Sequence, residues 1–401
     1  MAARRPGTRG SEARPAGGVW QAGFLVGAAV GAAVTVLARR AEAEARTGLV
    51  DWRAVGRLAE ARLRRAPGRL SVPEIAATEP AYRAAMARVV PALEAALGVP
   101  LPGIVDRVAV VDRAGWVQAN LVTFAGLFGR LEGELLDQLV PRGAGLAKAS
   151  MALANRWVTT RQLGFLLGFM GQRVLGQYDL ALLSAEAEPG QLLFVEESIR
   201  ATAAALGVDA APFRTWIALH ETTHAFEFEA HPWLRPYLAG RLERQLTAFS
   251  RNTSSLGGDA ARAVGRALRG GDGHWLERLM SDEQRALFRE TQAIMSLLEG
   301  FGDHVMDSVG RDLVPGVETI SARFHARRAA RTPMERAILR ITGLDLKMEQ
   351  YARGERFVAG IERIGGSPAL SRLWEGPETL PRDEELDHPE RWCRRVLGRA
   401  A

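Results

Sequence analysis

The stretch that decides the fold is His220-Glu221-Thr222-Thr223-His224, an HExxH motif. On a helix, residues four positions apart point to the same side, so both imidazoles can reach one ion. Zinc accepts such nitrogen ligands at ~2.0–2.1 Å. Glu221 follows the first histidine and can take a proton from a metal-bound water. The motif therefore predicts a helix that carries two metal ligands and a general base.

The flanking residues favour a helix around the motif. Asp209 is a candidate N-cap, and Pro212 suits a first helical turn. Pro232 should stop the helix shortly after the motif. The motif alone leaves two interpretations open, because HExxH also occurs by chance and a buried helix can carry hydrogen-bonded histidines without a metal.

A second segment, residues 295–307, favours the metal interpretation. Glu299 is the candidate third ligand, and Asp303 lies one turn later, where its carboxylate could accept the other ring proton of a ligand histidine. His304 in the same segment is an alternative ligand. Three protein ligands and one open position are typical of catalytic zinc, and a chain whose single cysteine is Cys393 cannot build a thiolate-rich structural site.

The two motifs together resemble the glutamate-type zincins. The sequence around both motifs is most similar to a bacterial family of zincin-like candidate hydrolases. That family is often labelled as associated with biosynthesis of the deazaflavin coenzyme. The resemblance implies a zincin-like metallopeptidase fold with His220, His224 and Glu299 at the metal positions and Glu221 as the base. It supplies no substrate, and His231 departs from the small or apolar residue expected there. The similar stretches are residues 111–117, 175–179, 216–234, 296–307, 344–351 and 377–381.

Composition limits the classes of partner. Hydrophobic residues make up 47% and charged residues 24% of the 401 residues, as in a folded domain of ordinary composition. The net charge is +6, and residues 1–50 contribute +4 of it through seven arginines and three glutamates. Only +2 remains for residues 51–401, so we expect no nucleic-acid partner.

The N-terminal region is expected to lie outside the catalytic domain. Residues 1–14 have the composition of a disordered leader, and residues 15–38 carry no charge. This Ala/Gly-rich segment could pack on the protein or a membrane surface, span a bilayer, or be a cleaved signal. We therefore predict residues 1–48 as a leader with an apolar helix and residues 49–401 as one catalytic domain, in a cytoplasmic protein with candidate membrane association through residues 15–38.

The remaining pattern predicts a mainly α fold of the α+β class, with a small β-sheet beside the metal-binding helices. Two short aliphatic runs, residues 107–111 and 191–195, are the strand candidates. Residues 192–195 could be an exposed edge that pairs with a peptide substrate, or a fully internal strand. Residues 250–273 could form a flap over the site. The expected helices are 51–65, one beginning at Ser71, 115–140, 143–174, 260–268, 281–309, 315–329, 333–342, 344–363 and 383–397.

The residues predict a zinc-dependent hydrolase, of metallopeptidase or amidase type, acting on a peptide or another amide. Metal-activated water would attack the amide carbonyl, with Glu221 as general base. Donors to the developing oxyanion could come from Tyr178, His231, Tyr237 or His304. The alternative is a catalytically silent zincin fold that serves as a binding or membrane-associated assembly module.

Overall fold

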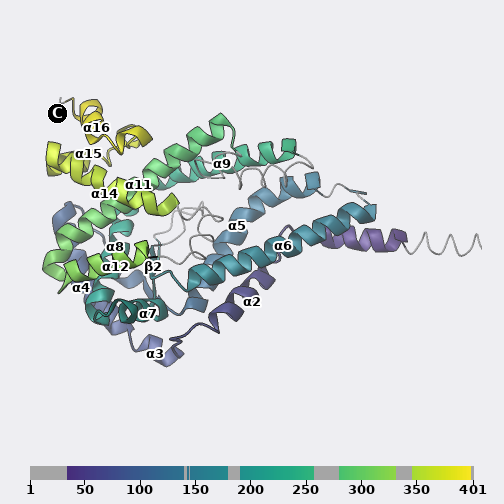
Figure 1. The fold of residues 1–401 in the computed structure, drawn as a ribbon, viewed down its shortest axis with the longest axis horizontal. Helices are drawn as coiled ribbons and strands as arrows, with labels where there is room; N and C mark the ends of the chain where they lie inside the picture. The colour runs from purple at the N-terminus through teal and green to yellow at the C-terminus, as the bar shows by residue number, and fades with distance from the viewer. Residues whose placement is uncertain are drawn as a thin grey trace, which may run out of the picture. The chain divides into compact units, whose positions relative to one another are not determined.

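The computed structural model describes residues 34–139, 142–143, 145–178, 190–256, 280–330 and 346–398. These residues form many helices and one small sheet (Figure 1), which confirms the predicted fold class. The chain divides into two compact units: residues 1–51 with 132–159, and residues 52–131 with 160–401. The helices are 34–45, α2 (Trp52–Leu63), α3 (Val72–Ala76), α4 (Glu79–Leu97), α5 (Arg113–Leu139), α6 (Gly145–Gly171), α7 (Glu196–Leu206), α8 (Ala210–Glu229), α9 (Leu234–Leu256), α11 (Asp282–Leu313), α12 (Val317–Ala329), α14 (Leu346–Gly365), α15 (Ser367–Arg372) and α16 (Pro389–Leu397).

Local sequence sets several helix starts. Ser71 before α3 and Ser281 before α11 both form a capping box with the third residue of the helix. The Ser281 hydroxyl accepts from Gln284 N at 3.2 Å, while the Gln284 side chain accepts from Ser281 N at 2.7 Å. Asp209 precedes α8 in extended conformation but makes no capping bond with its side chain. The helix predicted over 333–342 and the one over 260–268 lie outside the described residues.

The sheet contains three strands in the order β1-β3-β2, where β1 is Val108–Val111, β2 is Gly176–Tyr178 and β3 is Leu192–Val195. The two predicted strands are confirmed. β3 pairs in parallel with β1 on one side and antiparallel with β2 on the other. Of the two alternatives for residues 192–195, the internal strand is confirmed and the free edge for a substrate is wrong, because both edges of this fully buried strand are paired. β2, which the sequence did not predict as a strand, lies at the edge.

α8 passes through the middle of the larger unit. Thirteen of its twenty residues are buried, including Phe213, Trp216 and Phe228. The helices α4, α7 and α11 and the strand β2 pack against it. Burial on all sides explains why α8 lacks the one-sided apolar pattern of a surface helix. The motif residues of α8 are thereby fixed in a rigid part of the fold.

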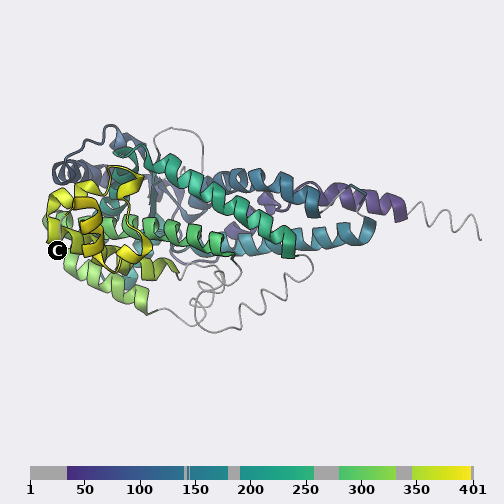
Figure 2. The same ribbon diagram turned by 90° about the horizontal axis from the view of Figure 1, so that it is seen from above.

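α11 lies between α8, α9 and α14, as the two ribbon views and the contacts agree (Figures 1 and 2). α14 crosses α11 at two glycines. A Cβ on Gly300 would lie 2.1 Å from the carbonyl carbon of Gly354, and a Cβ on Gly354 would lie 1.7 Å from the carbonyl oxygen of Ser296. Only residues without a side chain allow the two backbones to approach so closely.

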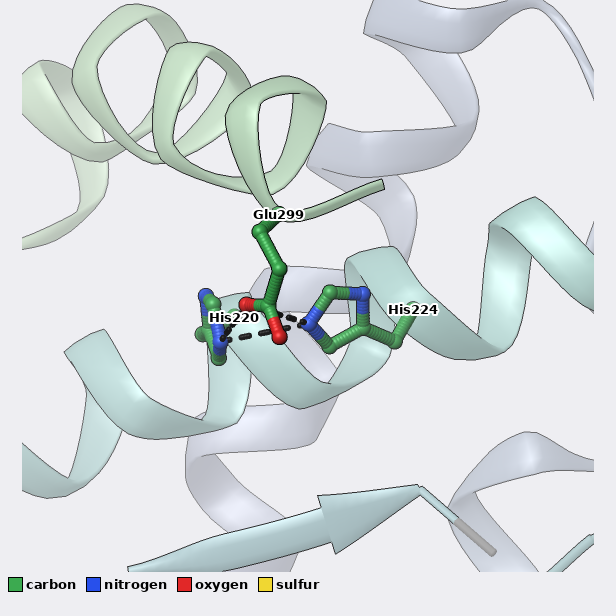
Figure 3. Close-up of side chains that lie close together, drawn as sticks. All are labelled: His220, His224 and Glu299. Atoms are coloured by element: carbon green, nitrogen blue, oxygen red, sulfur yellow. Dashed lines mark hydrogen bonds and ion pairs between the residues drawn. The ribbon is translucent and has the colours of Figure 1, made fainter. Parts of the chain in front are cut away.

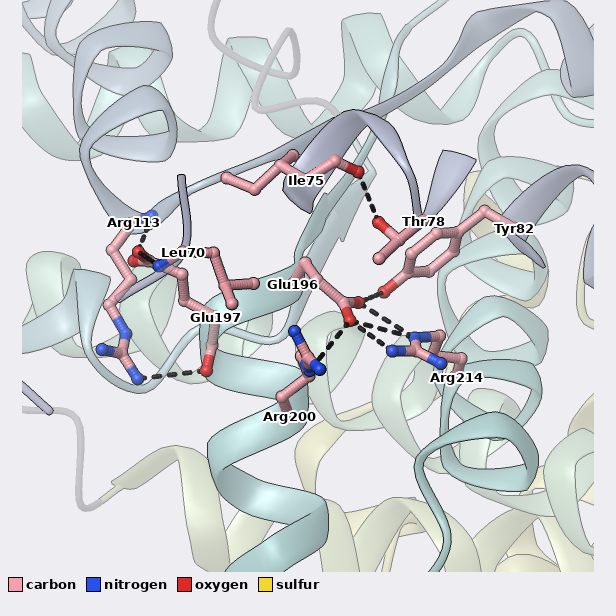
Figure 4. A network of polar contacts seen from close by, with 9 residues as sticks. All are labelled: Leu70, Ile75, Thr78, Tyr82, Arg113, Glu196, Glu197, Arg200 and Arg214. Carbon is pink, nitrogen blue, oxygen red and sulfur yellow. Dashed lines mark hydrogen bonds and ion pairs between the residues drawn. The ribbon is translucent and has the colours of Figure 1, made fainter. Parts of the chain in front are cut away.

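Two buried glutamates at the start of α7 tie the surrounding elements together (Figure 4). Glu196 accepts a hydrogen bond of 2.7 Å from the Tyr82 hydroxyl and a bidentate pair from Arg214. Glu197 accepts from the backbone N–H groups of Leu70 and Arg113, at 2.8 and 3.2 Å. These bonds connect α4 and α8 to α7 on one side and the chain before α3 to α5 on the other.

The smaller unit contains helix 34–45, the end of α5 and the beginning of α6. Gly143 N donates to Glu42 Oε1 at 2.9 Å, and Arg156 Nη1 donates to the Glu44 carbonyl at 3.3 Å. Leu49 N donates to Glu132 Oε1. Residues 132–159 thus cluster with the N-terminal segment by their contacts. In the described part of the chain, no helix is both long and apolar enough to cross a bilayer.

Candidate metal centre

Two histidines of α8 and one glutamate of α11 lie together in the larger unit (Figure 3). His220 Nε2 and His224 Nε2 are 3.2 Å apart, and Glu299 Oε2 lies 3.9 and 3.7 Å from them, respectively. Two tetrahedral zinc ligands at ~2.0–2.1 Å from the ion are about 3.3–3.4 Å apart. The triangle therefore has the size that one zinc ion requires. Within the described ranges, no other set of three His, Cys, Asp or Glu side chains converges in this way.

The opposite ring nitrogen of His224 faces a buried carboxylate. His224 Nδ1 lies 2.8 Å from Glu227 Oε2, and the Glu227 side chain is fully buried. This contact places the ring proton on Nδ1 and leaves the Nε2 lone pair for the centre. The sequence predicts Asp303 as the carboxylate that accepts the ring proton of a ligand histidine. For His224, Glu227 is in this position. Asp303 is buried on α11, one turn after Glu299.

His220 has an analogous arrangement with a sulfur atom. Its Nδ1 lies 3.0 Å from Met306 Sδ, a weak acceptor that cannot donate. This contact likewise favours a proton on Nδ1 and a lone pair on Nε2. Two nitrogen lone pairs and a carboxylate oxygen then converge, and such an acceptor set is stabilised by a cation. The residues present therefore fit a divalent metal ion.

The surroundings of the centre shift the pKa values of His224 and of its partner Glu227. Burial raises the pKa of Glu227 to about 7. Burial also opposes a charge on His224, but the carboxylates of Glu227 and Glu299 outweigh it and raise the pKa of His224. His224 and Glu227 are therefore coupled, and the charged form of each favours the charged form of the other.

Glu221 lies on the same helix, between the two histidines in sequence, and points toward β2. Its Oε2 accepts a hydrogen bond of 3.0 Å from the backbone N–H of Tyr178. Gly176 in β2 makes room for the same side chain, because a Cβ there would lie 2.6 Å from Glu221 Cγ. The edge strand thus fixes the carboxylate by one hydrogen bond and by the absence of one side chain.

The hydroxyl of Tyr178 belongs to a separate polar network. It donates to Glu229 Oε1 at 2.6 Å and accepts from Arg235 Nη2 at 2.6 Å. Arg107 binds both oxygens of Glu229, at 2.7 and 2.8 Å. Burial and the Glu229 carboxylate raise the pKa of Tyr178 to about 12, so the phenol stays protonated. The network holds β2 against the end of α8.

The other predicted donors have their own partners. His231 stacks on Trp374 with ring centroids 5.0 Å apart, and burial lowers its pKa to about 4. His304 Nε2 lies 3.2 Å from Glu362 Oε2 and so pairs with α14. The Tyr237 hydroxyl accepts a hydrogen bond of 2.5 Å from Arg241. The predicted flap lies outside the described residues, apart from residues 250–256, which form the end of α9.

Sequence reasoning missed three residues that shape the centre: Glu227, Gly176 and Met306. Glu227 carried a visible signal, because it follows His224 by three residues and must lie on the same helical face. Gly176 and Met306 carried none, since their roles depend on how β2 and α11 dock against α8.

The geometry fits a zincin-like site, with the two histidines of an HExxH motif on one helix and a carboxylate from a second helix. The chain belongs to the zincin-like metallopeptidase family, whose model matches residues 50–393. It is also similar to a crystal structure from Chloroflexus aurantiacus, described as a candidate hydrolase with a novel fold. The two share 35% identity and a TM-score of 0.64 over 88% of this chain and 100% of that one. No curated protein matches the chain.

Proposed function

We propose that the protein is a zinc-dependent hydrolase, of metallopeptidase type, that cleaves an amide bond with Glu221 as general base. One observation carries the proposal: the triangle of His220 Nε2, His224 Nε2 and Glu299 Oε2, with sides of 3.2 to 3.9 Å, beside a glutamate on the same helix. Family membership supports the same reaction class.

His220, His224 and Glu299 would hold the ion. A bound zinc ion supplies Lewis-acid polarisation of the substrate carbonyl and lowers the pKa of water toward ~7. Three protein ligands leave one of the four positions of zinc for water or substrate, as in catalytic sites. Glu227 keeps the His224 ring in the tautomer that presents Nε2.

Glu221 would move the proton. A carboxylate beside the centre accepts a proton from the attacking water and passes it to the nitrogen of the leaving amine. The Tyr178 N–H and the bare backbone of Gly176 hold the carboxylate in one place, so no reorientation precedes the transfer. Glu221 is 7% exposed, and this burial limits competition from bulk water.

The test compares zinc-loaded wild-type protein with Glu221→Gln on casein and on a mixed peptide library. We expect the variant to retain one zinc ion per chain and to lose roughly 10²–10⁴-fold in kcat/KM, the usual contribution of a general base. Glu318→Gln, which changes an exposed carboxylate on α12, serves as the matched control and should keep full activity.

Two results would overturn the proposal. Equal cleavage by the wild type and Glu221→Gln would remove Glu221 from the reaction. Wild-type protein without stoichiometric metal and without peptide cleavage would instead favour a binding or assembly module built on the zincin fold.

A further inference from the structure

The smaller unit, residues 1–51 with 132–159, holds most of the exposed large hydrophobic side chains among the described residues. Ten large hydrophobic side chains are exposed among the described residues, and seven of them belong to this unit. Trp157 is 61% and Met151 69% exposed on α6, and Leu37 is 55% exposed on helix 34–45. The seven are Val34, Val36, Leu37, Leu146, Met151, Trp157 and Val158.

These side chains recur with helical spacing. Met151 and Val158 are seven residues apart on α6, and Val34 and Leu37 are three apart on helix 34–45, so each pair shares one side of its helix. Arg156 of α6 donates a hydrogen bond to the Glu44 carbonyl of helix 34–45, and Gly143 N, just before α6, donates to the Glu42 side chain. Several large apolar side chains exposed on two connected helices are a feature of interaction sites.

The exposed charges of the same unit have one predominant sign. Among its described side chains, the ionic groups classed as exposed are four cations and one carboxylate, that of Glu44. The cations are Arg39, Arg40, Arg142 and Lys148. Apolar side chains bordered by arginine and lysine are typical of helices that lie in the interface of an anionic membrane. A tryptophan among them is also favourable at the level of the lipid headgroups.

The adjoining sequence points to the same partner. Residues 15–38 contain no charged side chain, and the last five of them lie in helix 34–45. Arg39 and Arg40 follow in the same helix. A second copy of the chain is the less suitable occupant, because a symmetric contact would place the exposed cations of one copy against those of the other. We infer that this unit docks the protein on an anionic phospholipid bilayer. The inference is independent of the proposed hydrolytic activity.

Vesicle flotation of the full chain tests the inference. Vesicles containing phosphatidylcholine and phosphatidylglycerol in equal amounts should carry the protein, whereas pure phosphatidylcholine vesicles should carry much less. The double variant Met151→Glu, Trp157→Glu should bind the mixed vesicles roughly tenfold more weakly or worse, because two apolar side chains leave the interface and two negative charges enter it. Both positions are exposed, so the melting temperature should not change, and this is checked on the same samples.

The matched control places glutamate at exposed apolar positions of the other unit. Val72 and Val122 are 80% and 77% exposed, and Val72→Glu, Val122→Glu should bind vesicles like the wild type. Equal binding by wild type and the Met151/Trp157 variant overturns the inference. A wild-type dimer in light scattering that this variant dissociates would overturn it in favour of a second copy of the chain.

Discussion

Glu227→Gln should weaken zinc binding without unfolding the protein. The Glu227 carboxylate lies 2.8 Å from His224 Nδ1 and is fully buried, so its hydrogen bond is charge-assisted and shielded from water. Loss of a carboxylate that orients a metal-binding histidine costs about 10- to 100-fold in metal affinity, or about 1.4–2.7 kcal/mol. Glutamine keeps an acceptor for the ring N–H but removes the charge, so we expect a value near tenfold.

Competition between the protein and a zinc-binding dye at fixed pH measures this effect. Glu318→Gln removes an exposed carboxylate on α12 and should leave the zinc Kd unchanged. Thermal unfolding of both variants shows whether they are folded. If Glu227→Gln binds zinc within twofold of the wild type and of this control, the contact with Glu227 does not prepare His224 for a metal, and the reasoning fails.

Three further changes probe the surroundings of the centre. Gly354→Ala forces a Cβ into a backbone carbonyl of α11 and should cost about 1–3 kcal/mol or more in urea denaturation, whereas Gly240→Ala, with no atom within 4 Å of its Cβ, should cost nothing. Gly176→Ala should displace Glu221 and lower kcat while the zinc Kd stays within a few-fold, so an unchanged kcat would contradict the contact. Burial lowers the pKa of His231 to about 4 from the ordinary 6.5, so the unfolded chain binds the extra proton and stability falls as the pH drops from 6.5 to 4. With allowance for partial exposure, the loss at pH 5 relative to pH 7 should be about 1 kcal/mol, and it should disappear from the unfolding curves of His231→Phe.

The metal-binding helix was predictable because its information is local. Spacing in the HExxH motif fixes which side of the helix His220 and His224 share, whatever surrounds them. Glu299 is 75 residues beyond His224, and it was singled out by its spacing from Asp303, which puts a second carboxylate one helical turn later. The structure brings all three side chains together, and the same spacing rule, applied to Glu227, would have found the partner of His224.

The remaining features depend on tertiary packing. A four-residue apolar segment such as 192–195 has the same sequence pattern in an edge strand and in a central strand. The sequence therefore could not show that this strand pairs with a neighbour on both sides. β2 has only three residues and no alternating pattern, and its role follows from its position beside Glu221. The crossing of α11 and α14 requires Gly300 and Gly354 to meet, although they are distant in sequence.

Anomalous diffraction at the zinc edge, from crystals grown with one equivalent of zinc, tests the central claim most directly. The account predicts one strong peak per chain within ~2.0–2.2 Å of His220 Nε2, His224 Nε2 and Glu299 Oε2. A map without a peak between these three atoms, or with its peak at other side chains, would contradict it.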